Sequence, residues 1–515
     1  MTGLLFSCLM TRFLLALLLG LPLSSCADPA KPLLSSVSPA QSTVFSSTRE
    51  VRGLSWNGKT LWAATGGGVL RFENGKWTKW TRQEGLPANE TFGVAADRTV
   101  RFPVATARFD EKGWMVQGAP PFQKPPLETT WRGQKVRASL DGLELGKRSF
   151  PLPKGSPGTH ISALLPLKTT LQVAVYGDGL YSFNGAKWTR DVAPVPNEAR
   201  EITALAGDGR TLWVGTRRTG IWRRQSGKWA QFIQAGEPFS HNVQFLARFR
   251  GVLWGSTLDD GVIYQNGTEW LRVATTDLSS TAPRQMLVWK DTLWVRHGTG
   301  IVDSFDGTTW KKDALGSIPR RGIYALGGDE QRLVASGWGG FAEWDGTTWT
   351  PHYDIGELKG VPILGILCDG DEVWLETQSR GAGLWNRASG AFKWLDERAG
   401  LPDDWVTALA KMDGKIYAGT FVGGLARLDG EKWFTFPELN GENVTSLCAS
   451  GTGGVLAATR HGVWKIEGDK ATKVNLAWLD TEDQALLEDE NGVWIGARTS
   501  LNFWRLPTEA TQNPT

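Results

Sequence analysis

The chain has 515 residues, a formal net charge of +3 at pH 7 and 41% apolar residues. This ordinary apolar content excludes an intrinsically disordered chain, and the near balance of charge excludes a global field that would hold nucleic acid. The 27 tryptophans, against 6 tyrosines, are unusual and require a structural cause.

The first residues have the features of a secretory signal. Arg12 precedes a short apolar run that ends at Leu19, well below the ~20 residues that a membrane-spanning helix needs. The following Leu23-Ser24-Ser25-Cys26 resembles the lipobox of bacterial lipoproteins, in which the cysteine becomes the acylated first residue. We therefore expect a signal peptide over residues 1–25, a lipid on Cys26 and a lipidated flexible linker over 26–42.

One pattern recurs along the rest of the chain. A typical copy opens with Leu212-Trp213-Val214-Gly215-Thr216 and continues with a Gly-aliphatic-x-Arg segment and a Gly-Lys-Trp segment. From Leu171 onward the copies begin about 40 residues apart, and two weaker copies near Val100 and Val136 bring the total to twelve. Short apolar–polar alternations between glycine turns predict antiparallel strands. Four such strands in each copy predict a propeller blade.

The fold class is therefore all-β, with about twelve four-stranded blades of ~40 residues. Because one ring normally closes with four to eight blades, we expect two β-propellers. An equal split gives propellers over 43–280 and 281–507, followed by a tail over 508–515, although a division of five and seven blades fits equally well. The last copy has no outer strand, and residues 43–46 are suited to supply it. In that alternative, one ring is inserted within the other.

The tryptophan excess is expected to be structural. A blade buries both faces against its neighbours, and a large ring at one strand position fills the widening space between blades. Six tryptophans fall in the second strand of a copy and seven open the fourth: Trp62, Trp213, Trp254, Trp294, Trp374 and Trp494, then Trp77, Trp188, Trp229, Trp270, Trp310, Trp349 and Trp433.

The cysteines and histidines indicate no metal site. Cys368 and Cys448 occupy equivalent places in copies that are not adjacent, so we expect two buried free thiols rather than a disulfide. No C-x-x-C pair occurs and the five histidines are isolated from one another, so neither a metal nor a cofactor is expected.

Candidate binding residues lie in the loops between the second and third strands, which we call the B–C loops. Strand positions repeat from copy to copy, but these loop positions vary, as expected of a recognition surface. Arg217 and Arg218 are suited to an anionic glycan or a partner's carboxylates. Trp338 and Phe421 are suited to stacking on a sugar or anchoring a peptide, or equally to covering the mouth of the channel. The full set is Asp178, Arg217, Arg218, Asp259, Asp260, His297, Trp338, Arg380, Phe421, Arg460, His461 and Arg498.

Two carboxylate pairs, Asp259-Asp260 and Asp403-Asp404, are the nearest approach to a catalytic constellation. Adjacent residues rarely act as acid and base on one bond, because those carboxyl groups must face each other across the substrate. Aspartate also favours turns for backbone reasons. We therefore predict no catalytic residue.

The repeat resembles a known family. Leu-Trp-x-Gly-Thr followed by Gly-Leu-x-Arg-Phe, together with Gly85-Leu86-Pro87 and Gly400-Leu401-Pro402, looks like the two-component regulator propeller repeat, and the resemblance covers nearly all of residues 49–506. That repeat builds the periplasmic sensor half of hybrid histidine kinases. Those sensors also carry a transmembrane helix and a kinase, which this sequence lacks, so only the recognition function carries over.

The sequence thus leads to a lipid-anchored protein of the cell envelope, at the periplasmic face or the outer surface. We expect it to bind a glycan or an envelope protein, as a sensor or scaffold, without chemistry and without nucleic acid. The alternative is a carbohydrate-active hydrolase or lyase with carboxylates in a cleft between the propellers.

Overall fold

The computed structural model describes residues 42–110, 112–139, 141–191, 195–258, 260–316, 322–450, 453–476 and 482–505. The described residues belong to one compact unit. The predicted signal peptide, Cys26, the linker up to residue 41 and the tail lie outside the described residues. Among the residues that are described, no helix is long and apolar enough to cross a membrane.

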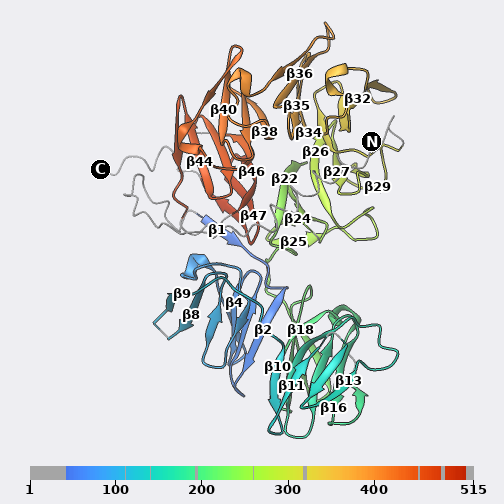
Figure 1. Ribbon diagram of the computed structural model, residues 1–515, viewed down its shortest axis with the longest axis vertical. Coiled ribbons are helices and arrows are strands. Elements are labelled where there is room, and N and C mark those ends of the chain that lie inside the picture. The colour runs from blue at the N-terminus through green and yellow to red at the C-terminus, as the bar shows by residue number, and fades with distance from the viewer. Residues whose placement is uncertain are drawn as a thin grey trace. The chain divides into compact units, whose positions relative to one another are not determined.

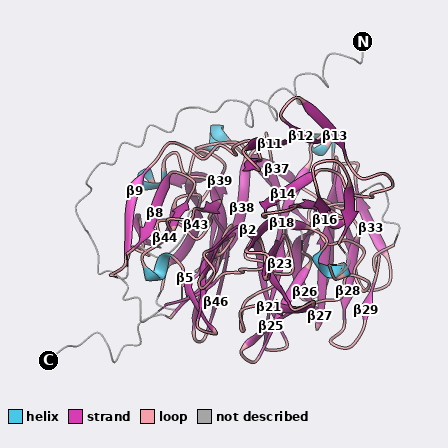
Figure 2. Cartoon of the chain, turned by 90° about the horizontal axis from the view of Figure 1, so that it is seen from below, coloured by secondary structure: helices cyan, strands magenta, loops and turns pink. Residues whose placement is uncertain are grey.

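The described residues form twelve four-stranded antiparallel sheets, which confirms the all-β fold class and the twelve repeats (Figure 2). Between residues 51 and 232 the strands are β2 (Val51–Trp56), β3 (Leu61–Thr65), β4 (Gly68–Glu73), β5 (Lys76–Trp80), β6 (Gly93–Val94), β7 (Thr99–Arg101), β8 (Ala105–Phe109), β9 (Trp114–Gly118), β10 (Glu128–Trp131), β11 (Gln134–Ala138), β12 (Gly142–Leu145), β13 (Arg148–Pro151), β14 (Ile161–Pro166), β15 (Leu171–Val175), β16 (Gly179–Phe183), β17 (Trp188–Arg190), β18 (Ile202–Gly207), β19 (Thr211–Thr216), β20 (Ile221–Gln225) and β21 (Lys228–Phe232).

The remaining sheets comprise the C-terminal half of the chain and one strand from its start. Their strands are β22 (Val243–Phe249), β23 (Val252–Thr257), β24 (Val262–Asn266), β25 (Glu269–Arg272), β26 (Pro283–Trp289), β27 (Thr292–His297), β28 (Val302–Phe305), β29 (Trp310–Lys311), β30 (Ala325–Gly328), β31 (Leu333–Gly337), β32 (Gly340–Trp344), β33 (Trp349–His352), β34 (Ile363–Asp369), β35 (Glu372–Thr377), β36 (Ala382–Asn386), β37 (Phe392–Leu395), β38 (Val406–Met412), β39 (Lys415–Thr420), β40 (Leu425–Asp429), β41 (Lys432–Thr435), β42 (Val444–Ala449), β43 (Val455–Thr459), β44 (Gly462–Glu467), β45 (Lys470–Lys473), β46 (Asp483–Asp489), β47 (Gly492–Ala497), β48 (Leu501–Trp504) and β1 (Ser42–Phe45).

Glycine turns connect the strands, as the repeat predicts. In the β4–β5 hairpin, Asn74 and Gly75 have φ angles of 51° and 78°, a left-handed conformation that Asn-Gly adopts readily and that matches the twist of the flanking strands. The helices among the described residues are short 3-10 turns: η2 (Arg82–Glu84), η3 (Asn197–Ala199), η4 (Gly356–Leu358), η5 (Glu397–Ala399) and η6 (Pro437–Leu439).

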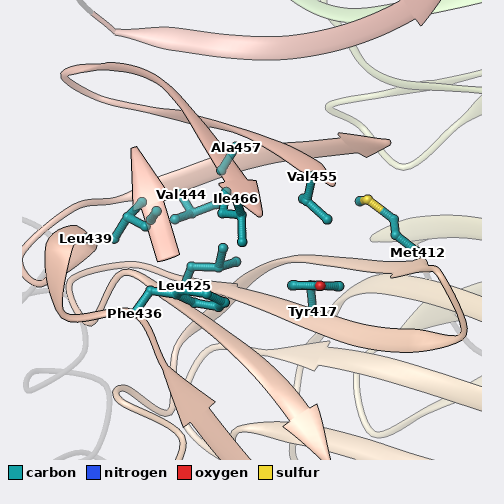
Figure 3. Packing of buried hydrophobic residues seen from close by; sticks show 10 residues of the cluster. Met412, Tyr417, Leu425, Phe436, Leu439, Val444, Val455, Ala457 and Ile466 are labelled. Atoms are coloured by element: carbon teal, nitrogen blue, oxygen red, sulfur yellow. The ribbon is translucent and has the colours of Figure 1, made fainter. Parts of the chain in front are cut away.

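Hydrophobic clusters fill the spaces between neighbouring sheets. Figure 3 shows one of them, in which Leu425 and Phe436 from one sheet face Val444, Val455 and Ile466 from the next. All thirteen tryptophans assigned to structural positions belong to such clusters. The six in second strands are 0–6% exposed, so the wedge interpretation of the tryptophan excess is confirmed.

The N-terminal strand β1 completes the sheet at the other end of the chain. It pairs antiparallel with β48, with Ser42 opposite Trp504 and Phe45 opposite Leu501 (Figure 1). This pairing confirms that residues near 43–46 supply the missing outer strand. The first strands of the sheets contact one another in two series: β6, β2, β18, β14 and β10 in one, and β22, β26, β30, β34, β38, β42 and β46 in the other, with β46 also contacting β22.

Replacing Phe45 with alanine tests how firmly β1 holds this sheet together. Phe45 stacks on Trp494 with ring centroids 5.7 Å apart and meets Trp270 edge-on at 6.0 Å. We expect Phe45→Ala to lower the free energy of unfolding by about 2 kcal/mol, measured by denaturant titration, because the change removes a half-buried aromatic ring. Thr43→Ala on the exposed side of β1 is the control, and an equal loss in the two variants would contradict the packing role.

The two interior cysteines are free, as predicted. Both are partly exposed rather than fully buried, because each lies near the end of a first strand, Cys368 in β34 and Cys448 in β42. Their surroundings still raise the pKa of each thiol to about 12, mainly through burial, so neither thiol is a reactive thiolate at neutral pH.

Candidate functional site

A cavity of about 210 Å³ lies where three B–C loops meet the two segments that lead into β2 and β22. The loops are those between β19 and β20, β23 and β24, and β47 and β48. The lining residues are Ser47, Arg49, Glu50, Arg52, Glu90, Arg217, Arg218, Phe239, Ser240, His241, Asn242, Leu258, Asp260, Arg498 and Thr499. Four of the predicted binding residues, Arg217, Arg218, Asp260 and Arg498, are therefore brought together.

The repeat itself positions two of these loops. The threonine that ends the Leu-Trp-x-Gly-Thr motif is buried, and its hydroxyl closes the loop by donating to a backbone carbonyl. Thr216 donates to Gly220 at 2.9 Å, and Thr257 donates to Gly261 at 2.7 Å. The residues between each threonine and glycine are consequently held outward, where Arg218 and Asp260 reach the cavity.

A chain of ion pairs forms one wall of the cavity. The Arg52 guanidinium donates to both oxygens of Glu50, at 3.0 and 3.1 Å, and to Glu90 at 2.8 Å. Glu90 also accepts from Arg498 at 2.8 Å. Burial by itself would lower the pKa of Arg52, but the two carboxylates raise it above its ordinary value. Burial likewise would raise the pKa of Glu50, but Arg52, His241 and Arg217 lower it. These groups are held as charged partners.

The second wall is built around Arg218. Its guanidinium donates to Glu201 at 3.2 Å and forms a close ion pair with Asp260. Arg217, its neighbour on the same loop, is exposed at the rim of the cavity. Of the basic pair predicted from the sequence, Arg218 thus contacts carboxylates of the protein and Arg217 is exposed at the rim.

The connecting segments supply residues that the sequence did not single out. Arg49 lies over the ring of Phe239, 4.2 Å from its centroid, and Arg272 lies over the same ring at 3.8 Å. His241 Nδ1 lies 3.3 Å from the Ser47 carbonyl, and burial lowers the pKa of His241, so the ring is neutral at pH 7. These residues stand outside the repeating motif, so no spacing signal marks them. Only their aromatic and basic character was visible.

The other predicted residues are distributed away from the cavity. Asp178 and His297 are buried, which differs from the expected exposed position. Asp178 accepts from the Tyr181 hydroxyl at 2.6 Å and from Arg190 at 2.8 Å. His297 lies 2.7 Å from the Asp303 carboxylate. Both were assigned to loops from the sequence, but their side chains turn inward, Asp178 to Tyr181 and Arg190 and His297 to Asp303.

Exposed positions account for most of the rest. Trp338 is 49% exposed and Arg380, Arg460 and His461 are exposed, the last 3.0 Å from the Glu442 carboxylate. Phe421 stacks on Trp405 with ring centroids 4.1 Å apart. Asp259 lies outside the described residues.

Of the carboxylates considered for catalysis, Asp403 and Asp404 serve the backbone, whereas Asp260 forms an ion pair with Arg218. Asp403 accepts from the amides of Trp405 and Val422, at 3.0 and 2.9 Å, and Asp404 accepts from the amide of Glu397 at 2.9 Å. Both are thus turn residues, in agreement with the interpretation from sequence. In the part of the chain that the structure describes, no three His, Cys, Asp or Glu side chains are grouped to hold a metal ion.

No protein-family model and no curated protein matches the chain. Among solved structures, the extracellular domain of the hybrid two component system BT4673 from B. thetaiotaomicron is similar over 90% of this chain and 71% of that one, at 19% identity and a TM-score of 0.46. The extracellular domain of the hybrid system BT3049 from the same organism covers 94% of this chain, with 72% of its own length, at 16% identity and a TM-score of 0.46. PorZ, a surface component of the type-IX secretion system of Porphyromonas gingivalis, covers 89% and 79%, at 11% identity and a TM-score of 0.35. At identities this low, these are similarities of chain path alone.

Proposed function

We propose that the chain is a lipid-anchored β-propeller protein of the cell envelope that binds a ligand or partner protein at the cavity, without chemistry. Cys26 carries the lipid and holds the protein at the periplasmic face or the outer surface of a membrane. The lipobox-like Leu23-Ser24-Ser25-Cys26 supports the anchor. The resemblance of the repeat to sensor-type propellers supports a recognition role.

The twelve sheets divide into a five-bladed propeller nested within a seven-bladed one. The contact between β2 and β18 supports closure of the first over residues 51–232. The contact between β22 and β46, and the pairing of β1 with β48, support closure of the second by both ends of the chain. This division replaces the equal split at residue 280. It makes the segments before β2 and β22 the two crossings between the propellers, and both crossings line the cavity.

The single observation that carries the binding proposal is the convergence of the variable B–C loop residues on one cavity. Arg217, Arg218, Asp260 and Arg498 come from three sheets, yet all line the same 210 Å³ space. The repeat otherwise keeps these loop positions glycine-rich, so the convergence of varied side chains from three loops on one cavity supports a recognition surface. Asp260 and the other lining carboxylates are held in ion pairs, which favours binding over proton transfer.

The proposal predicts selective loss of binding when the cavity is changed. The full lipidated chain would be displayed to membrane extracts and to a panel of bacterial polysaccharides, with the bound fraction quantified. We expect the double variant Arg217→Ala/Arg498→Ala to bind at least about tenfold more weakly than the parent chain, since it removes two of the guanidinium groups. Arg380→Ala, on an equivalent loop outside the cavity, is the matched control.

Two outcomes would count against this function. Equal weakening in the double variant and in Arg380→Ala would remove the cavity as the site. Hydrolysis or elimination of a panel polysaccharide, lost on Asp260→Asn, would favour the hydrolase or lyase instead. Separately, Cys26→Ser is expected to move the protein from the membrane fraction to the soluble fraction and to abolish labelling with palmitate.

A further inference from the structure

More arginines than carboxylates line the cavity. Among the described residues, five arginines line it, Arg49, Arg52, Arg217, Arg218 and Arg498, against three carboxylates, Glu50, Glu90 and Asp260. Two further carboxylates, Glu201 and Glu482, lie outside the lining and pair with Arg218 and Arg498. The histidine in the same wall is neutral at pH 7, because burial lowers its pKa.

Arg49 has no ion pair with a described residue. Arg52, Arg218 and Arg498 each have a carboxylate within 3.3 Å. For Arg49, no Asp or Glu of the described chain lies within the 4.0 Å of an ion pair, and its Nε is buried without a hydrogen-bond partner. A buried guanidinium N–H that has no acceptor is costly to the folded state.

The surroundings hold Arg49 in place without forming an ion pair with it. Its backbone carbonyl accepts from the Gly220 amide at 2.9 Å, and its guanidinium rests on the Phe239 ring. The nearby Glu237 is already committed, with Thr48 donating to it at 2.9 Å and Lys79 at 2.8 Å. Arg272, over the same ring, also has no ion pair with a described residue. Burial lowers the pKa of both arginines. At Arg49 the Glu237 and Asp260 carboxylates act against this lowering, and the charge of Arg272 adds to it.

We propose that Arg49 is the receptor for an anionic group, a carboxylate or sulfate, of a small hydroxylated ligand that occupies the cavity. This inference rests on the proposed function and names its ligand class. The planar guanidinium offers paired donors to such a group, and the anion supplies the missing counter-charge. Asn242 Oδ1, which also lines the cavity and has no partner, accepts from a ligand hydroxyl. A volume of 210 Å³ equals that of about seven waters, which suits a single acidic sugar.

Galacturonate, galactose 6-sulfate and galactose are suitable probes, because they differ only in the anionic group. In calorimetric titrations of the full chain, we expect at least one of the two anions to bind and galactose to bind at least about tenfold more weakly. Whether galacturonate or galactose 6-sulfate binds shows whether the site prefers a carboxylate or a sulfate. Raising the salt concentration is expected to lower the affinity for the anionic sugar and to leave the affinity for galactose unchanged.

Substitution of Arg49 separates its charge from its packing. We expect Arg49→Gln to bind the anionic sugar at least about tenfold more weakly than the parent chain. The affinity of Arg49→Lys is expected to lie between those of the parent and Arg49→Gln, because lysine keeps the charge but loses the paired donors. Arg223→Gln is the matched control. Arg223 is also half-buried over aromatic rings, 5.5 Å from the Trp213 centroid, but does not line the cavity.

The melting temperature of each variant shows whether it folds as the parent does. If Arg49→Gln melts earlier, the comparison passes to Arg49→Lys, where unchanged anion affinity would overturn the proposal. Failure of both anions to bind better than galactose would overturn it as well. In that case, continued loss of partner or polysaccharide binding in Arg217→Ala/Arg498→Ala would leave the proposed function standing without an anionic ligand.

Discussion

Replacing Glu343 with alanine is expected to lower the free energy of unfolding by about 3–5 kcal/mol, because it strips the counter-charge from a buried network. Glu343, in β32, is 1% exposed. One carboxylate oxygen accepts from Arg332 at 2.9 Å and from His352 at 3.1 Å, and the other accepts from Arg387 at 2.6 Å. Arg387 belongs to the next sheet, so the carboxylate ties two sheets together. Denaturant titration at pH 7 measures the loss.

The same carboxylate predicts an acid limit of stability. Burial by itself would raise the pKa of Glu343, but hydrogen bonds from His352 and Arg387 lower it to about 2, from an ordinary 4.5. A lowered carboxylate pKa contributes stability above the unfolded value, and this contribution is lost as pH falls from about 4.5 to about 2. Glu343→Ala should therefore show less loss of stability across this window than the parent chain.

Glu431 provides the control for this prediction. Its carboxylate is also ion-paired, with Lys393 at 3.3 Å, but the side chain is 85% exposed. Glu431→Ala is expected to change the free energy of unfolding by less than about 1 kcal/mol, since exposed pairs are weak. If Glu343→Ala costs no more than Glu431→Ala, the network does not hold the sheets together.

Replacing Glu376 with glutamine is expected to stabilise the protein at pH 8 by up to about 3 kcal/mol. Glu376 is opposite Gly365 in the β34–β35 pair, a position that holds Ala64, Gly215 and Gly419 in other sheets. Its carboxylate fills the space where a Cβ at Gly365 would collide. Burial raises its pKa to about 7, against which a hydrogen bond from the Leu409 amide acts only weakly.

The sign of this effect follows from proton uptake on folding. Between about pH 4.5 and pH 7 the unfolded chain ionises Glu376 while the folded chain keeps its proton. Stability therefore falls as pH rises through this window, and above about pH 7 the folded state carries the full cost of an ionised, buried Glu376. Glutamine carries no charge at any pH, so the variant should match the parent near pH 4 and exceed it at pH 8. Thermal unfolding at both pH values tests this.

Glu372→Gln on the same strand is the control for Glu376→Gln. Glu372 accepts from the Trp374 indole at 3.0 Å. A parallel pH response in the two variants would show that Glu376 ionises like an ordinary surface carboxylate.

Much of the fold was predictable because local chemistry repeats. In the copy from Val406 to Thr435, the sequence pattern predicts strands over 406–410, 416–419, 425–428 and 433–436. The observed strands agree to within two residues, since alternation and Asp-Gly turns act over a few neighbours. The site was only partly predictable. Arg218 and Arg498 were named because they interrupt glycine-rich loops, but Arg49 and Phe239 lie in segments with no repeat to interrupt.

His297 shows the converse error. Its loop position and lone imidazole gave it the same standing as Arg498, yet it lies wholly buried against Asp303. A loop side chain turns inward when a buried partner is present to bond it. For His297 that partner is Asp303, which belongs to the following strand. Sequence variation alone does not separate a ligand contact from an internal pair.

The sequence by itself determined the all-β class, the twelve repeats and the structural role of the tryptophans, because strand alternation, turns and wedge packing are set by residues close together in the chain. Only the tertiary structure decided that residues near 49, 239, 260 and 498 share one cavity and that Arg49 lacks a counter-charge there. Charge balance depends on groups from distant segments, and their distances are fixed only when the sheets have packed.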